Sequence, residues 1–310
     1  MFTDVVGEST AGSPQADIRW TNLAQSEIAR RMTVRGVRLS RFVVRQLLRR
    51  HGFVRRKLVK KKSMGSHPDR NAQFENISRL KSEYLAAGQP VISIDTKKKE
   101  LIGNFHRNGQ SYATAAVETF DHDFPSFADG KVIPHGVYDL ATNTAHVSLG
   151  TSHDTTEFAC DSVAAWWEAG GRTDHPGAER LLILCDGGGS NPARSDLFKA
   201  DVQSLANRLG LEIRVAHYPP YCSKHNPIEH RVFPHVTRAC AGVVFTDVPL
   251  VKRLVERAGT ASGLRVSCGI LGKAYAVGRK AVKGMAKGLR LIRDAVLPKW
   301  NYRLLPKPDG

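Results

Sequence analysis

The stretch "RLLILCDGGGSNPAR", from Arg180 to Arg194, joins an apolar strand to a carboxylate and a flexible turn. Its run of four aliphatic residues is typical of a strand that is covered on both faces. Asp186 follows this run, and three glycines follow Asp186. Asp-Gly is a common turn pair, because the Asp side chain bonds its own backbone and glycine accepts positive φ. The stretch is therefore either an ordinary turn or a strand end that presents a carboxylate.

The segments on either side of this strand predict an α/β fold. Earlier strands joined by short turns favour antiparallel pairing, whereas later strands separated by helices favour parallel pairing. We expect a mixed five-stranded sheet with helices on its faces. Segments with a strand pattern lie at 91–95, 99–105, 134–150 (a hairpin), 180–186 and 211–220, and the predicted helices lie at 154–170, 193–210 and 226–242.

Length and composition limit the class of protein. The 310 residues, 41% of them hydrophobic, allow one large domain or two modest ones. No run approaches the ~18 apolar residues of a membrane-spanning helix. The start of the chain is polar without a basic segment, so it is not a signal peptide, and we interpret residues 1–16 as a flexible leader. Five scattered cysteines without a CxxC pair fit a reduced, cytoplasmic protein.

The net charge of +17 is unevenly distributed. Residues 1–88 carry 18 basic and 7 acidic side chains, residues 89–251 carry 14 and 19, and residues 252–310 carry 14 and 3. Two basic ends favour a polyanionic partner, most simply nucleic acid. An acidic centre within a basic protein suggests metal ions. The alternative is a soluble basic protein without such a partner.

Residues 17–62 are predicted to form a helix-turn-helix DNA-binding region. Between Ile28 and Pro68 the chain has 14 basic residues and no acidic one. Gly36 breaks a first helix, and Ser40 is a plausible N-cap for a second helix over residues 41–50. A second helix of this kind enters the major groove. Its apolar face differs from the face of Arg41, Arg45 and Arg49, and the linker residues Lys60, Lys61 and Lys62 are candidates for phosphate contacts. The alternative is a basic helical hairpin with a solvated arginine face.

The rest of the chain divides into three predicted parts. We expect a linker and a helix over residues 63–89, the α/β domain over residues 90–250, and a basic C-terminal extension over residues 251–310.

Three carboxylates are candidates for one site. Asp95 and Asp186 each end a predicted strand, and Glu229 lies in the first turn of a later helix. If the two strands are parallel neighbours, both aspartates emerge at one edge of the sheet. Converging carboxylates suit Mg²⁺, and two such ions ~4 Å apart can assist an in-line phosphoryl transfer. Each residue also has a structural interpretation: Asp95 as a surface charge facing Lys97–Lys99, Asp186 as an Asx turn, and Glu229 as a capping-box residue with Asn226.

Several blocks resemble the Rhodopirellula-type DDE transposases of bacterial insertion sequences, which belong to the RNase H-like, retroviral-integrase superfamily. These blocks are "SHPDRNAQFENI", "PVISIDTKKKELIGNF", "HDFPSFADGKVIPHGVYDL", "LLILCDGGGSN", "YPPYCSKHNPIEHRVF" and "KWNYRLLP". The resemblance spans roughly Trp20 to Pro306. His225 departs from it, because we expect a tryptophan between the lysine and the asparagine.

This resemblance implies an RNase H-like domain with Asp95, Asp186 and Glu229 as catalytic and metal-binding residues for two Mg²⁺ ions, which Mn²⁺ can replace. It implies a transposase that acts on double-stranded DNA, both the terminal inverted repeats of its element and the target. We also expect Lys224 to contact DNA, and we expect a homo-oligomer on DNA, associated with the nucleoid and not with a membrane. The alternative is a helix-turn-helix DNA-binding protein whose RNase H-like domain is inert, as a regulator or a decayed copy. A zinc site among His217, Cys222, His225, His230 and His235 is disfavoured, because paired ligand spacing is absent.

Overall fold

The computed structural model describes residues 1–7, 10–13, 16–56, 68–282 and 284–308. The chain divides into two compact units, an N-terminal unit of residues 1–62 and a C-terminal unit of residues 63–310.

The described part of the N-terminal unit contains three helices around a small apolar core. Its elements are α1 (Phe2–Gly7), the antiparallel pair β1 (Thr10–Ser13) and β2 (Ala16–Thr21), α2 (Gln25–Val34) and α3 (Arg41–Arg50). The predicted break and cap are present, because Gly36 adopts a φ of +85° and the Ser40 hydroxyl accepts a hydrogen bond from the Val43 amide. The prediction of a flexible leader is wrong for residues 2–7. Helix α1 forms there because its apolar side chains are buried against those of α2 and α3: Phe2, Val5, Val6, Ile28, Met32 and Val44.

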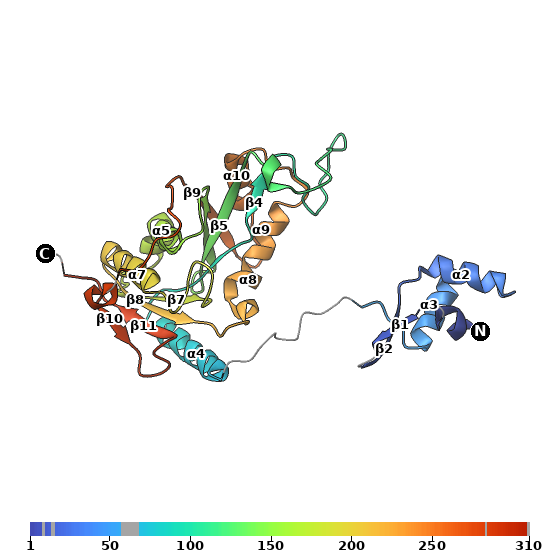
Figure 1. The fold of residues 1–310 in the computed structure, drawn as a ribbon, viewed down its shortest axis with the longest axis horizontal. Coiled ribbons are helices and arrows are strands. Elements are labelled where there is room, and N and C mark those ends of the chain that lie inside the picture. Colours follow the sequence, from blue (N-terminus) through green and yellow to red (C-terminus); the bar gives the residue numbers. More distant parts are fainter. Residues whose placement is uncertain (8–9, 14–15, 57–67, 283, 309–310) are drawn as a thin grey trace. The chain divides into compact units, whose positions relative to one another are not determined.

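The C-terminal unit is built on one nine-stranded sheet (Figure 1). The strands lie in the order β10-β11-β8-β7-β3-β5-β6-β9, and β4 pairs with β5 outside this path. Their bounds are β3 Val91–Thr96, β4 Glu100–Ile102, β5 Gly130–Asp139, β6 Thr144–Gly150, β7 Arg180–Cys185, β8 Glu212–His217, β9 Arg265–Leu271, β10 Leu291–Arg293 and β11 Asn301–Leu304.

The predicted mixed sheet is confirmed. Strands β3, β7 and β8 are parallel to one another, whereas β5 runs antiparallel to both β3 and β6. These five strands form the centre of the sheet, which is wider than predicted. Residues 251–310 are not a separate extension, because β9 pairs with β6 and β11 pairs with β8. The backbone groups at the edges of a five-stranded sheet need partners, and these C-terminal strands supply them.

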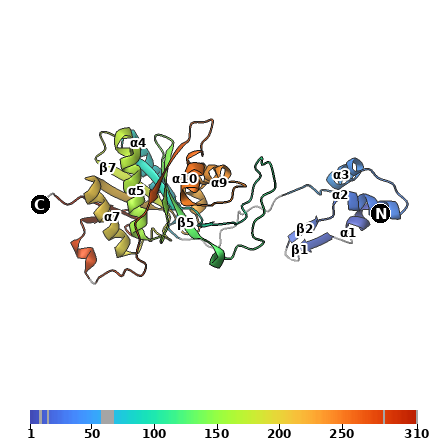
Figure 2. The same cartoon turned by 90° about the horizontal axis from the view of Figure 1, so that it is seen from above.

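Helices cover both faces of the sheet (Figure 2). One face carries α5 (Thr156–Trp166) and α7 (Asp196–Leu209), and the other carries α4 (Arg70–Ala86), α8 (Pro227–Arg231), α9 (Phe233–Ala239) and α10 (Val248–Glu256). Shorter helical turns lie at Pro125–Phe127, Trp167–Gly171, Arg172–Asp174, Ser223–His225 and Met285–Gly288. None of the helices in the described ranges is long and apolar enough to cross a membrane.

The alternation of side chains along β3 determines where its polar end lies. Ile92 and Ile94 belong to the core beneath α5 and α7, whereas Val91 belongs to the core beneath α4. Because successive side chains of a strand point to opposite faces, Asp95 emerges on the same face as α4 and α8. Thr96 emerges on the opposite face.

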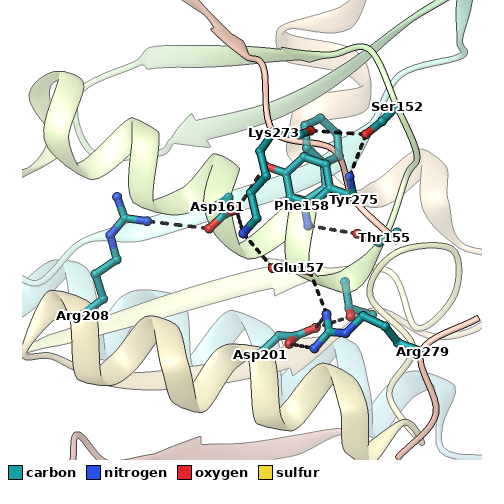
Figure 3. Close-up of polar contacts among 11 residues, drawn as sticks. Ser152, Thr155, Glu157, Phe158, Asp161, Asp201, Arg208, Lys273, Tyr275 and Arg279 are labelled. Carbon is teal, nitrogen blue, oxygen red and sulfur yellow. Dashed lines mark hydrogen bonds and ion pairs between the residues drawn. The ribbon is translucent and has the colours of Figure 1, made fainter. Parts of the chain in front are cut away.

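The segment that follows β9 is tied to α5 and α7 by ion pairs (Figure 3). Lys273 lies 2.6 Å from a carboxylate oxygen of Glu157, and Arg279 lies 2.8 Å from Asp201. The Tyr275 hydroxyl donates to Asp161 at 3.1 Å. These contacts fix a basic segment, which the sequence placed in the C-terminal extension, against the helical layer.

Candidate active site

The register of β3 and β7 brings Asp95 and Asp186 to one edge of the sheet. Val91 pairs with Leu182, and Ser93 pairs with Leu184, in a parallel ladder. The same offset of 91 positions relates Asp95 to Asp186. The two strands are therefore parallel neighbours, as the prediction for these two aspartates required.

Glu229 is held beside Asp95 by a buried hydrogen-bond group between β3 and α8. The Ser93 hydroxyl donates to the side-chain oxygen of Asn226, Oδ1, at 2.5 Å. The same hydroxyl accepts a hydrogen bond from the Ile228 backbone amide at 3.0 Å. The Asn226 side-chain amide donates to the Ile94 carbonyl at 3.0 Å. Because these groups are fully buried, leaving any one of them unpaired would be costly. The side chain of Asn226 thus attaches α8 to β3 instead of capping it, and the capping box considered for Glu229 is not formed.

A glycine in β5 allows α8 to approach the sheet this closely. Gly136 pairs with Asp95 in the antiparallel ladder. A Cβ atom at this position would lie 2.6 Å from the Ile228 Cδ1 atom and 2.9 Å from the Phe233 Cε1 atom. A larger residue would displace the Ile228 and Phe233 side chains and thereby disturb the packing of α8 against the strand end.

The three carboxylates, which we call the carboxylate site (Asp95, Asp186 and Glu229), interact with one another. Burial, a hydrogen bond with Glu229 and the charge of Asp186 raise the pKa of Asp95 to about 8. Burial and the charge of Glu229 raise the pKa of Asp186 to about 6. Carboxylates that are close together and poorly hydrated resist simultaneous ionisation.

The arrangement has the features of a site for hard cations. The Asp186 Oδ1 atom is buried without a hydrogen-bond partner, so Asp186 does not use it in an Asx turn. In the described parts of the chain, no lysine or arginine forms an ion pair with any of the three carboxylates. Within the same parts, no three His, Cys, Asp or Glu side chains are grouped closely enough to hold a metal by themselves. Mg²⁺ is commonly held by only one or two carboxylates together with water and substrate phosphates, so the donors present fit this ion.

The backbone of Asp186 is supported by a buried histidine that the sequence did not single out for this role. The His217 Nδ1 atom lies 3.2 Å from the Asp186 carbonyl oxygen, and its Nε2 atom lies 3.2 Å from the Tyr302 hydroxyl. Burial lowers the pKa of His217 to about 4, so the ring is neutral at physiological pH. Tyr302 belongs to "KWNYRLLP", yet no local pattern links it to the aspartate.

Four of the seven residues predicted to contact DNA lie within the described part of the structure. Arg41, Arg45 and Arg49 are exposed on α3, as their phase on the helix predicted. The Arg45 guanidinium lies 5.7 Å from the ring centre of Phe42, a residue that does not join the apolar stripe and is 59% exposed. Lys224 is exposed on the short turn before α8. Lys60, Lys61 and Lys62 lie outside the described residues.

The chain was compared with known proteins. Three solved structures of the Mos1 transposase are similar to it: a paired-end complex with the left transposon end, a mariner paired-end complex with Mn, and one with Mg. All three have 16% identity and a TM-score of 0.45. The first and third cover 81% of this chain and 68% of their own, and the second covers 78% and 72%.

A comparison with curated protein sequences found no match. The family model described as "Rhodopirellula transposase DDE domain" matches residues 2–306, which is almost the whole chain. The match includes both strand-end aspartates, the asparagine that attaches α8, and Glu229. The chain therefore belongs to the family of the Rhodopirellula transposase DDE domain.

Proposed function

We propose that this protein is an insertion-sequence transposase that cleaves DNA strands at the ends of its element and joins the 3′-hydroxyl to target DNA. The observation that carries the proposal is the carboxylate site. Its three acidic groups are gathered at one edge of the sheet and partly withdrawn from water, and no cationic side chain among the described residues forms an ion pair with them. Close, partly buried carboxylates destabilise the metal-free protein. Such a group is expected at a functional site where a bound cation neutralises the negative charge.

Asp95 and Asp186 would hold the metal ions from β3 and β7, and Glu229 would complete the site from α8. Two bound Mg²⁺ ions, or Mn²⁺ in their place, supply the charge that activates an attacking oxygen and stabilises a leaving one. The residues of the chain contribute position: Ser93 and Asn226 hold Glu229 in place, and His217 holds the Asp186 backbone. The glycine turn after Asp186 leaves room for a DNA strand, because a Cβ at Gly188 or Gly189 would meet no other atom within 4 Å.

Double-stranded DNA is the proposed partner, at the terminal inverted repeats and at the target. The exposed arginines of α3 would read or follow the DNA as a helix-turn-helix, and Lys224 would contact a phosphate close to the carboxylate site. We further propose that the protein acts as a homo-oligomer on DNA in the bacterial cytoplasm, near the nucleoid.

Plasmid cleavage tests the proposal. The plasmid carries this gene with several hundred flanking base pairs, and purified protein is added with Mg²⁺. Controls are EDTA, Asp186→Asn, and Glu118→Gln, which removes an exposed carboxylate from the irregular segment before β5. We expect cuts at fixed positions with the wild type and Glu118→Gln. Asp186→Asn should give no cuts but should retain salt-sensitive DNA binding.

The alternative, a DNA-binding protein with an inert domain, predicts a different result. DNA binding would then be present for every variant, and no cut would appear with any of them at any Mg²⁺ or Mn²⁺ concentration. That outcome would refute the transposase activity while leaving the family membership intact.

A further inference from the structure

Thr96, the last residue of β3, bonds the Asp95 carboxylate through its backbone and the turn after Asp186 through its side chain. Its backbone amide donates to the Asp95 Oδ1 atom at 2.7 Å. Its side chain points to the opposite face of the sheet, where the hydroxyl lies 3.3 Å from the Ser190 hydroxyl and 3.1 Å from the Asp154 Oδ1 atom. Ser190 closes the glycine turn that begins after Asp186. One residue thus connects the Asp95 carboxylate to the turn that carries Asp186.

The direction of these hydrogen bonds follows from the donors available. A threonine hydroxyl has one proton, and the Asp154 carboxylate can only accept, so the Thr96 hydroxyl donates to Asp154. The Ser190 hydroxyl must then donate to Thr96. The resulting series of hydrogen bonds runs from Ser190 through Thr96 to Asp154. It ends on a charged acceptor, which strengthens the hydrogen bond from Thr96. Ser190 is 95% buried, so water cannot readily replace the bond it would lose.

Asp154, the last acceptor in this series of hydrogen bonds, follows two residues that are bonded to the basic segment after β9. Asp154 does not cap α5, because Thr155 is the N-cap and its hydroxyl accepts the Phe158 amide. Asp154 is therefore available to Thr96. The two residues before Asp154 are bonded to the segment after β9. Ser152 accepts the Tyr275 amide at 3.0 Å (Figure 3). The His153 Nδ1 atom lies 3.1 Å from the Tyr275 carbonyl oxygen.

We propose that Thr96 and Asp154 are positioning residues for the carboxylate site: they fix the Asp186 turn relative to Asp95 and thereby set the affinity of the site for divalent cations. This inference rests on the proposed function, because it assumes that the carboxylate site binds Mg²⁺. Neither residue touches the reacting atoms. Hydrogen-bond partners one step behind metal ligands typically change metal affinity or activity by about 10–100-fold when they are removed.

Thr96→Val and Thr96→Ser form a matched pair. Valine keeps the shape of the side chain and the backbone bond to Asp95 but removes the hydroxyl, whereas serine keeps the hydroxyl. Mg²⁺ is titrated into the full-length protein without DNA, and the thermal unfolding temperature is followed to obtain the half-saturating concentration. The urea midpoint in EDTA is measured beside it, and plasmid cleavage is repeated over the same Mg²⁺ range.

We expect Thr96→Val to need about tenfold more Mg²⁺ in both the thermal titration and the cleavage assay, the lower end of this range, because the lost hydroxyl bonds the turn and not a metal ligand itself. Thr96→Ser should stay within about threefold of the wild type. Asp154→Ala should resemble Thr96→Val, and it carries the test if the valine variant does not fold. A merely structural role would lower the urea midpoint in EDTA and leave the half-saturating Mg²⁺ concentration unchanged.

The possible failures are distinct. If the wild type binds Mg²⁺ and cleaves DNA but Thr96→Val and Asp154→Ala have wild-type Mg²⁺ dependence, the positioning role is refuted and the proposed function stands. If the wild type neither binds Mg²⁺ nor cleaves, both are refuted.

Discussion

Replacing Asp95 by asparagine should stabilise the metal-free protein, although it removes a proposed catalytic residue. The pKa of Asp95 is raised from 3.8 to about 8 by burial, by its hydrogen bond with Glu229 and by the charge of Asp186. Because the folded-state pKa lies above the unfolded one, the carboxyl group favours folding most below about pH 4. That contribution is lost as the pH rises towards 8. Asparagine has no proton to lose and keeps an oxygen that can accept the Thr96 amide.

The magnitude follows from the same two pKa values. Between these two pKa values, each pH unit lowers the free energy of unfolding of the wild type by about 1.4 kcal/mol. The full loss at pH 8 would therefore be about 5 kcal/mol. Asp95 is only partly buried, and water that reaches it reduces this loss. The asparagine amide must also find a new acceptor, for which Glu229 is available. We therefore expect Asp95→Asn to be more stable than the wild type by about 2 kcal/mol at pH 8 and by less than about 1 kcal/mol at pH 5.

Urea unfolding in EDTA at pH 5 and at pH 8 measures this difference. Tryptophan fluorescence suits the assay, because three of the four tryptophans lie in the C-terminal unit: Trp166, Trp167 and Trp300. Glu118→Gln is the matched control, since it removes an exposed carboxylate and should change the stability by less than about 0.5 kcal/mol. The reasoning is wrong if Asp95→Asn is no more stable than the wild type at pH 8, or if the difference does not grow with pH.

Three further predictions concern other parts of the molecule. Gly136→Ala should cost about 1–3 kcal/mol in urea unfolding and lower the cleavage rate, because its Cβ would collide with Ile228 and disturb the packing of α8, which carries Glu229. Asn226→Ala should cost about 2–3 kcal/mol by the same measurement, because it leaves the buried Ser93 hydroxyl without its acceptor. Arg45→Ala should weaken DNA binding uniformly across sequences and reduce the slope of log affinity against log salt by about one, as measured by fluorescence anisotropy.

Each of these has a result that would contradict it. An alanine at position 136 that leaves both stability and cleavage unchanged would show that α8 does not need the close approach. Wild-type stability of Asn226→Ala would mean that water replaces the lost bonds. An unchanged salt slope for Arg45→Ala would exclude a phosphate contact, and a loss confined to one DNA sequence would indicate base reading instead.

Much of the local structure could be predicted from the sequence, because it depends on neighbouring residues. The break at Gly36, the cap at Ser40 and the end of α7 at Gly210 follow from backbone preferences that act over a few positions. The apolar runs before Asp95 and Asp186 predicted their strands for the same reason. Two of the three site residues, Asp95 and Asp186, were found because each follows such a run, whereas Glu229 lies in the first turn of a helix.

Which strands pair and which helices pack together depended on the tertiary structure. The offset of 91 positions between β3 and β7, the addition of β9 and β11 to the sheet, and the packing of α1 against α2 all involve distant or weakly patterned segments. Ser93 and Thr96 carry no sequence signal for their roles, because a hydroxyl in a strand is common and only its neighbours give it meaning. Local sequence patterns identify Asp95 and Asp186 as carboxylates at strand ends. Whether they meet, and which groups hold them together, depended on strand order and register, which arise from contacts across the whole domain.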